Sequence, residues 1–172
     1  MLKKIFAHRG ASAYAPENTL PAFEKAVDIG ADGVELDIHL SRDGRLVVIH
    51  DEMLDRTTNG HGFVKDFTLA ELKKLDASKT MTNSGFCNLR IPTLGEVYEL
   101  LADTELLVNV EVKNSIFLYP GILEKALEAE AKYGMSGRVL YSSFNLPLHC
   151  KHAVHDYEMQ KKRHCCQHVD GG

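Results

Sequence analysis

Two segments of the chain alternate apolar residues with carboxylates. In "VELDIHL", residues 34–40, Glu35 and Asp37 stand between aliphatic residues, and Glu111 has the same setting in "LVNVEVK". Successive side chains of a β-strand point to opposite faces, so each segment predicts a strand with one apolar and one acidic face. Carboxylates brought together repel one another and resist ionisation. A divalent cation removes that conflict, and hard oxygen ligands favour Mg²⁺ or Ca²⁺ over zinc.

Histidines and cations stand close to the same predicted strand ends. His8 and Arg9 follow the first apolar segment, His50 ends "LVVIH", and Lys113 ends "LVNVEVK". Histidine can act as general acid and general base near neutral pH, while arginine and lysine hold phosphate. A metal, two histidines and two cations together indicate phosphoryl-transfer chemistry.

Each of these residues also has a purely structural interpretation. Glu35 or Asp37 alone would more often form a buried ion pair with Arg9 or Lys113, because buried charges need partners. A lone histidine is more often structural, and we interpret His39 and His61 in that way. For the whole set the functional interpretation is favoured, since a salt bridge does not require two histidines at strand ends.

The elements that must position these groups alternate along the chain. We expect strands at about residues 4–7, 33–40, 46–49, 105–113 and 138–144, and helices at about 18–30, 68–75, 93–102 and 120–133. Asn18 is the expected N-cap of the first helix, and capping boxes open the second and third. Strands that alternate with helices indicate a parallel sheet and an α/β fold. In a (β/α) barrel, polar groups at the carboxyl ends of strands converge on one face.

The motifs resemble, in order, those of the glycerophosphodiester phosphodiesterases. The match consists of HRG, PENT, the E-x-D strand, "VVIHD", "DRTTNGHG", "PTLGEVYELL", "VNVEVK" and "YSSF". It covers roughly residues 3–145, and although each piece is weak, the ordered set is highly specific. The phosphatidylinositol phospholipases, a related barrel family with two histidines, fit less well.

The resemblance implies a TIM-type (β/α) barrel with a small insertion after strand three. It implies metal-dependent hydrolysis of glycerophosphodiesters, such as glycerophosphocholine, to glycerol 3-phosphate and an alcohol. The implied roles are metal binding by Glu35, Asp37 and Glu111, acid–base catalysis by His8 and His50, and phosphate contact by Arg9 and Lys113. One family-like route is attack by the glycerol 2-hydroxyl to give a cyclic phosphate that water then opens.

The length of the chain shapes the expected domain. A complete barrel of this type takes about 250 residues, and this chain has 172. We therefore expect a partial barrel over residues 1–145, ending after about five strands and including an insertion at 52–92. Two exposed barrel edges then favour self-association.

Residues 146–172 depart from the pattern. They hold three of the four cysteines and five of the nine histidines, in no recognised zinc-binding spacing. We expect a non-native or disordered tail. Two alternatives to the enzyme stay open: an impaired fragment that binds only metal or phosphate, and an interaction protein that works through this tail.

Charge and hydropathy exclude other classes of function. The net charge of −4 offers no basic stripe for nucleic acid. No apolar run approaches the ~20 residues of a membrane span. The N-terminus does not read as a signal peptide, so we expect a cytoplasmic protein.

Overall fold

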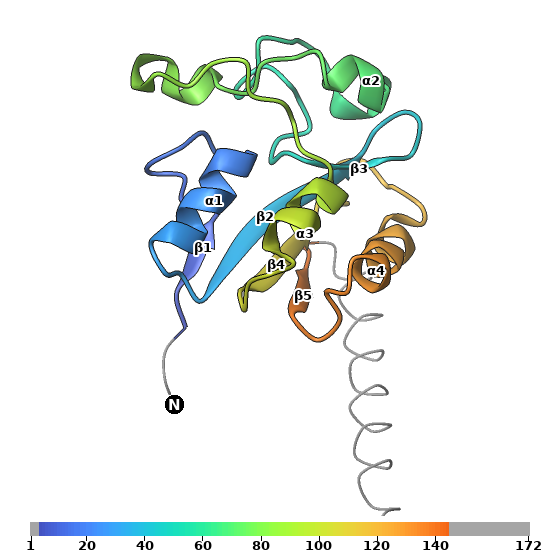
Figure 1. Ribbon diagram of the computed structural model, residues 1–172. Helices are drawn as coiled ribbons and strands as arrows, with labels where there is room; N and C mark the ends of the chain where they lie inside the picture. Colours follow the sequence, from blue (N-terminus) through green and yellow to red (C-terminus); the bar gives the residue numbers. More distant parts are fainter. Residues whose placement is uncertain (1–3, 145–172) are drawn as a thin grey trace, which may run out of the picture.

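The computed structural model describes residues 4–144, which form one sheet with helices on one of its faces (Figure 1). The elements are β1 (Phe6–His8), α1 (Leu20–Asp28), β2 (Gly33–Leu40), β3 (Leu46–Val48), α2 (Leu69–Leu72), α3 (Leu94–Leu101), β4 (Leu107–Val112), α4 (Ile122–Lys132) and β5 (Val139–Ser142), with short 3₁₀ helices at Val64–Asp66 and Lys79–Ser84. The expected strands and helices are therefore present in the expected order. The tail predicted at residues 146–172 lies outside the described residues.

The sheet is parallel along the path β1-β2-β4-β5. Its third strand differs from the expectation, because β3 pairs with β2 in the antiparallel sense, with Leu40 opposite Leu46. The turn between them, with Gly44 at φ 71°, is too short for a parallel crossover. The hairpin therefore folds β3 back onto the end of β2, and β4 takes the next parallel position.

The apolar strand residues form the main core on the helical face of the sheet. Val34, Leu36 and Ile38 of β2 are fully buried, and they pack in one cluster with β4 and with α1, α3 and α4. The period-2 pattern of the sequence therefore selects which face meets the helices. The acidic residues of the same strands must point to the opposite face, the inner side of a (β/α) barrel.

The segment after β3 builds a second, smaller core. Leu54, Val64, Leu72 and Ile91 are buried together with Val47 of β3. The segment lies over the carboxyl ends of the strands (Figure 1). The capping box expected at Thr68 is present, with Glu71 donating its backbone N–H to the Thr68 hydroxyl. The predicted insertion thus lies beside the end of the sheet that carries the polar groups.

Two helix starts differ from the expectation. The N-cap of α1 is Thr19, with Pro21 in the first turn, and not Asn18. Asn18 lies before the helix in the left-handed region, at φ 56°. The last helix begins at Ile122 and not at Pro120, because Gly121 at its N-cap has φ 77°. Positive φ is incompatible with helical geometry, so both starts move towards the C-terminus.

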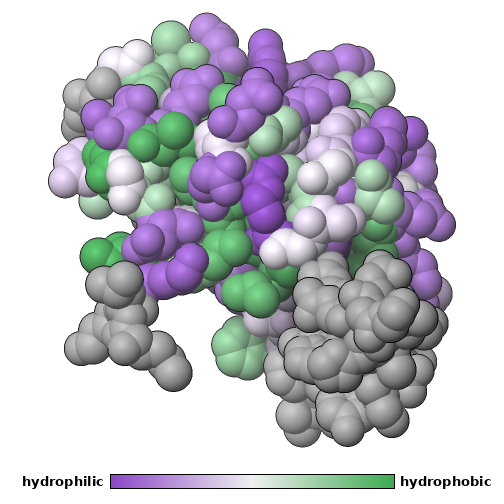
Figure 2. Space-filling model, turned by 60° about the horizontal axis from the view of Figure 1, so that its bottom comes forward, coloured by the Kyte–Doolittle hydropathy of each residue, from purple (hydrophilic) through white to green (hydrophobic). Residues whose placement is uncertain are grey.

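The two outer strands of the sheet leave edges open. Within residues 4–144, β1 pairs only with β2, and β5 pairs only with β4. Leu140 on β5 is 53% exposed and Ile5, just before β1, is 71% exposed. Apolar side chains also gather on the face where the strands begin (Figure 2). No described helix is long and apolar enough to cross a membrane.

Candidate active site

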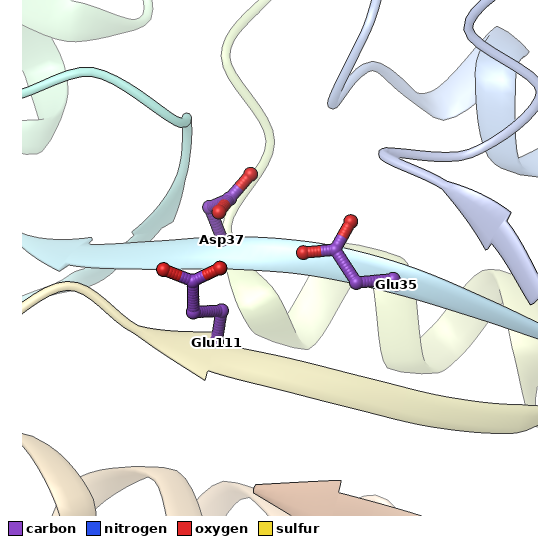
Figure 3. A group of neighbouring side chains, drawn as sticks. All are labelled: Glu35, Asp37 and Glu111. Atoms are coloured by element: carbon purple, nitrogen blue, oxygen red, sulfur yellow. The ribbon is translucent and has the colours of Figure 1, made fainter. Parts of the chain in front are cut away.

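Three carboxylates converge on the inner face of the sheet. Asp37 of β2 is directly opposite Glu111 of β4, and Glu35 lies two residues before Asp37 on the same face. One oxygen of each carboxylate lies within 4.8 Å of the others. Figure 3 shows the three side chains on the same side of β2 and β4. We refer to these residues as the acidic triad. Strand register alone brings them together, as the alternating pattern predicts.

Burial makes the acidic triad electrostatically costly. Asp37 is fully buried and Glu35 is 9% exposed. Burial, together with the charges of Asp37 and Glu111, raises the pKa of Glu35 to about 7, although the backbone N–H of Arg9 donates to it. A group of carboxylates that resists full ionisation suits a cation.

Two cations contact the acidic triad. The Lys113 Nζ lies 2.5 Å from Glu111 Oε1 and 3.0 Å from Asp37 Oδ1. Burial opposes the charge of Lys113, but the contacts with both acids raise its pKa. The Arg9 Nε lies 3.6 Å from Asp37 Oδ2. Arg9 and Lys113, predicted as phosphate ligands, are thus held beside the carboxylates.

The loop after β1 contributes Asn18, which the sequence analysis interpreted as the N-cap of the first helix. The Asn18 side chain is buried, and its Nδ2 donates to Asp37 Oδ2 at 2.9 Å. Arg9 and Asn18 both have a left-handed backbone conformation. The backbone N–H of Asn18 donates a hydrogen bond to the carbonyl oxygen of Arg9. Backbone strain of this kind clusters at functional sites. The PENT motif was the sequence signal that Asn18 belongs to the site, but a helix N-cap was the simpler local interpretation of this residue.

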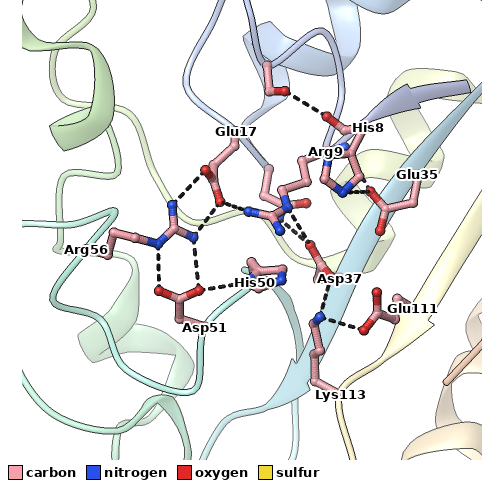
Figure 4. A network of polar contacts seen from close by, with 12 residues as sticks. His8, Arg9, Glu17, Glu35, Asp37, His50, Asp51, Arg56, Glu111 and Lys113 are labelled. Atoms are coloured by element: carbon pink, nitrogen blue, oxygen red, sulfur yellow. Dashed lines mark hydrogen bonds and ion pairs between the residues drawn. The ribbon is translucent and has the colours of Figure 1, made fainter. Parts of the chain in front are cut away.

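The two predicted histidines lie at the margin of the acidic triad (Figure 4). His8 ends β1 with its side chain 70% exposed, and its Nε2 is 3.8 Å from Glu35 Oε2. His50 follows β3, and its Nδ1 lies 2.6 Å from Asp51 Oδ1. The structure therefore brings together all seven predicted site residues, from β1, β2, β4 and the segments that follow β1, β3 and β4.

The histidines interpreted as structural are placed accordingly. His39 is fully buried, and its Nε2 lies 3.1 Å from the backbone oxygen of His50. Burial lowers the pKa of His39, so the ring is neutral at physiological pH. His61 is exposed and pairs with Asp55. Asn109 has the inward direction of Glu111 and accepts a hydrogen bond from Ser142.

A network of three further charged residues was missed from the sequence. Arg56 bonds both Asp51 and Glu17 in bidentate fashion, with four N···O distances from 2.7 to 3.0 Å. Glu17 also accepts from Arg9 Nη1 at 2.9 Å. We refer to Glu17, Asp51 and Arg56 as the loop network (Figure 4). The motifs PENT, HD and DRTT contain all three, but no periodicity shows that they meet.

Comparison with known proteins shows the family to which the chain belongs. Residues 8–156 match the model of the glycerophosphoryl diester phosphodiesterase family, and the chain belongs to that family. A relative from Caldanaerobacter subterraneus, named glycerophosphodiester phosphodiesterase, is 57% identical over 141 residues. The match covers 82% of this chain and 58% of the relative.

Solved structures give the same fold. A glycerophosphodiester phosphodiesterase from Agrobacterium tumefaciens superposes with a TM-score of 0.74 at 39% identity, covering 84% of this chain and 59% of that one. An Oleispira antarctica phosphodiesterase, solved in complex with the product sn-glycerol-3-phosphate, has a TM-score of 0.67 at 36% identity over the same shares. The described sheet is therefore part of a (β/α) barrel, and the chain spans about three fifths of these relatives.

Proposed function

We propose that this chain carries the metal and acid–base groups for hydrolysis of glycerophosphodiesters to glycerol 3-phosphate and an alcohol. The observation that carries the proposal is the convergence of the acidic triad, two histidines and two cations at one end of the sheet. The product complex of the Oleispira relative supports the choice of substrate class.

The donor set fits a divalent cation. Three carboxylates from two strands offer oxygen ligands, and burial with mutual repulsion keeps the pKa of Glu35 at about 7. Glu35, Asp37 and Glu111 would hold Mg²⁺ or Ca²⁺, which prefer such ligands. When bound, the ion would supply positive charge that stabilises the phosphoryl oxygens. Lys113 is well placed to leave its two acid partners and contact the phosphate.

The histidines would move the protons. In the first step the glycerol 2-oxygen forms a bond to phosphorus while the bond to the alcohol oxygen breaks. One histidine accepts the proton of the 2-hydroxyl, and the other donates a proton to the leaving alcohol. Water then opens the cyclic phosphate with both proton transfers reversed. His8 and His50 take these two roles, and Arg9 orients the phosphate.

A coupled assay for glycerol 3-phosphate release from glycerophosphocholine tests the proposal. It is run with Mg²⁺, with Ca²⁺ and with EDTA, on the parent chain, Glu35→Ala and His8→Ala. We expect divalent-metal-dependent release that both variants lose. The matched control is Glu128→Gln, which changes an exposed carboxylate on α4 and keeps parental activity. Release that persists in EDTA or in Glu35→Ala contradicts the proposed role of the acidic triad.

The second candidate is a chain that binds metal or phosphate without turnover. It is favoured by one observation, the ion pairs that Arg9 and Lys113 already form with the acidic triad. Saturable Mn²⁺ binding by a folded sample that releases no glycerol 3-phosphate would decide for this candidate.

The open sheet edges support a further expectation about assembly. Unpaired edge strands with exposed apolar residues pair readily with other chains. We expect β1 and β5 to mediate self-association, which light scattering after size exclusion measures. A Leu140→Lys variant should shift the population towards monomer. A cytoplasmic location stays a prediction from the sequence.

A further inference from the structure

The charged side chains around the site form one continuous series of contacts in which acids alternate with bases. His50 contacts Asp51, Asp51 contacts Arg56, and Arg56 contacts Glu17. Glu17 also contacts Arg9, and Arg9 contacts Asp37. Lys113 then connects Asp37 to Glu111. His50, which follows β3, is thus connected to the acidic triad of β2 and β4 through a residue of the segment that covers the strand ends (Figure 4).

Asp51 restricts the protonation of His50. Hydrogen bonds from Arg56, with a further bond to His50, lower the pKa of Asp51 to about 2. Asp51 is therefore a carboxylate at neutral pH, and a carboxylate only accepts hydrogen bonds. The His50 Nδ1, 2.6 Å from Asp51 Oδ1, must then carry the proton. In the neutral ring this leaves the lone pair on Nε2, the nitrogen that a base in the site would use.

Arg56 restricts the position of Asp51. It gives two hydrogen bonds to Asp51 and two to Glu17, a residue 39 positions earlier in the sequence. Burial works against the charge of Glu17, but the bonds from Arg56 and Arg9 lower its pKa. The bonds to both acids in turn raise the pKa of Arg56. A planar guanidinium with two bidentate partners fixes both carboxylates in one plane, as an ammonium cannot.

The backbone of His50 is fixed from the opposite side. The buried His39 ring contacts the His50 carbonyl, and Ile49 N donates to Asp37 O. With the backbone held, the remaining freedom of His50 is rotation and tautomer of its ring. Asp51 is the partner that removes this freedom.

We propose that Asp51 is a positioning residue that holds His50 in the Nδ1–H tautomer, and that Arg56 locks Asp51 in place by binding it to Glu17. The inference rests on the proposed function for its catalytic meaning. Asp51 acts through His50 and does not touch the reacting atoms. The segment after β3 thereby contributes to the site through Arg56, beyond covering the strand ends.

The test is the ring ¹⁵N spectrum of His50 in the full chain, which reports the tautomer without turnover. Samples labelled with ¹⁵N-histidine are measured where the ring is neutral, and His50→Gln identifies the signals. We expect the Nδ1–H tautomer in the parent chain. In Asp51→Ala we expect the Nε2–H form to become dominant, and in Arg56→Lys a mixture of both.

The Asp55–His61 pair provides a matched control in the same segment. Its Nδ1–Oδ1 distance is 2.8 Å, but the His61 side chain is 80% exposed. Asp55→Ala should leave the His50 signals unchanged. If the parent chain shows the Nε2–H form at His50, or if Asp51→Ala retains the Nδ1–H form, the proposal is overturned. Thermal melts of each variant confirm that the fold is intact before the spectra are compared.

Kinetics separate this inference from the proposed function. If glycerol 3-phosphate is released, Asp51→Ala should lower kcat about 10²-fold with little change in KM, because acid–base catalysis contributes about 10²–10⁴-fold. A parental kcat in a variant that has lost the Nδ1–H tautomer overturns the positioning role. A locked tautomer in a chain without turnover overturns only the proposed function.

Discussion

The acidic triad and the loop network hold their side chains by different means. The triad lies on two hydrogen-bonded strands, where register sets the positions of its carboxylates. The loop network joins segments outside the sheet through Arg56, whose side chain is 43% exposed. Strand positions follow from backbone pairing, whereas positions in loops depend on side-chain contacts. The acidic triad is therefore the rigid half of the site, and His50 belongs to the adjustable half.

The largest expected effect removes a ligand from the rigid half. Asp37→Asn should weaken Mn²⁺ binding about 10³-fold, or about 4 kcal/mol, because it removes the negative charge of a buried carboxylate from the acidic triad. The His50 tautomer should stay unchanged, since Asp51 still holds the ring. Mn²⁺ titration followed by electron paramagnetic resonance measures the affinity, with Glu128→Gln as the control. Parental affinity in Asp37→Asn would remove Asp37 from the ligand set.

A core substitution in the segment that carries Arg56 should disturb the loop network and leave the acidic triad in place. Leu72 is fully buried in the smaller core, so Leu72→Ala should destabilise that segment by about 3 kcal/mol. Hydrogen exchange should accelerate over residues 52–92, and the His50 tautomer should become mixed, while Mn²⁺ affinity stays near the parental value. Val110→Ala in the main core is the comparison, because loosening β4 should weaken metal binding as well. Equal loss of metal binding in both variants would mean that the halves are not separable.

The acidic triad should make stability depend on pH. The pKa of Glu35 is raised from 4.5 to about 7 in the folded chain. The folded state therefore binds this proton more tightly, and the stability it contributes is complete below pH 4.5 and lost as pH rises through about 7. In EDTA the free energy of unfolding should fall by up to about 3 kcal/mol across that range. Urea denaturation at a series of pH values measures it, and Glu35→Gln should flatten the curve.

The smallest effect concerns the link from the loop after β1 to the acidic triad. Asn18→Gly keeps the positive φ but removes the hydrogen bond to Asp37, which should lower stability by about 2 kcal/mol. Asn88 has the same φ of 56° on an exposed loop, so Asn88→Gly is the matched control and should have almost no effect. Thermal denaturation in EDTA measures both. Equal effects would show that backbone conformation, and not the hydrogen bond, is what matters at Asn18.

Sequence reasoning succeeded where the signal is local. The alternation around Glu35, Asp37 and Glu111 is set by the pleat of a strand, so it predicted both the buried acids and the face they share. The capping boxes at Thr68 and Thr93 involve residues three positions apart, and both are present. The strand-end position of His8 likewise follows from the order of the elements, whereas His50 reaches the site just after the end of an antiparallel strand.

Sequence reasoning failed where the partner is distant or the backbone is unusual. The direction of β3 depends on the short turn after β2, and alternation is the same in parallel and antiparallel strands. Asn18 suits a helix cap by type, but its positive φ turns the side chain towards Asp37. No short-range sequence pattern distinguishes a charged side chain that is solvated from one that forms an ion pair.

The sequence by itself therefore determined the element order, the faces of the strands and the identity of the candidate ligands. Only the tertiary structure decided that Arg56 bonds Glu17 and Asp51, and that Asp51 in turn holds His50. The physical reason is range. Periodicity and capping act over a few residues, whereas an ion pair across 39 residues exists only after the sheet and the smaller core have brought the two loops together.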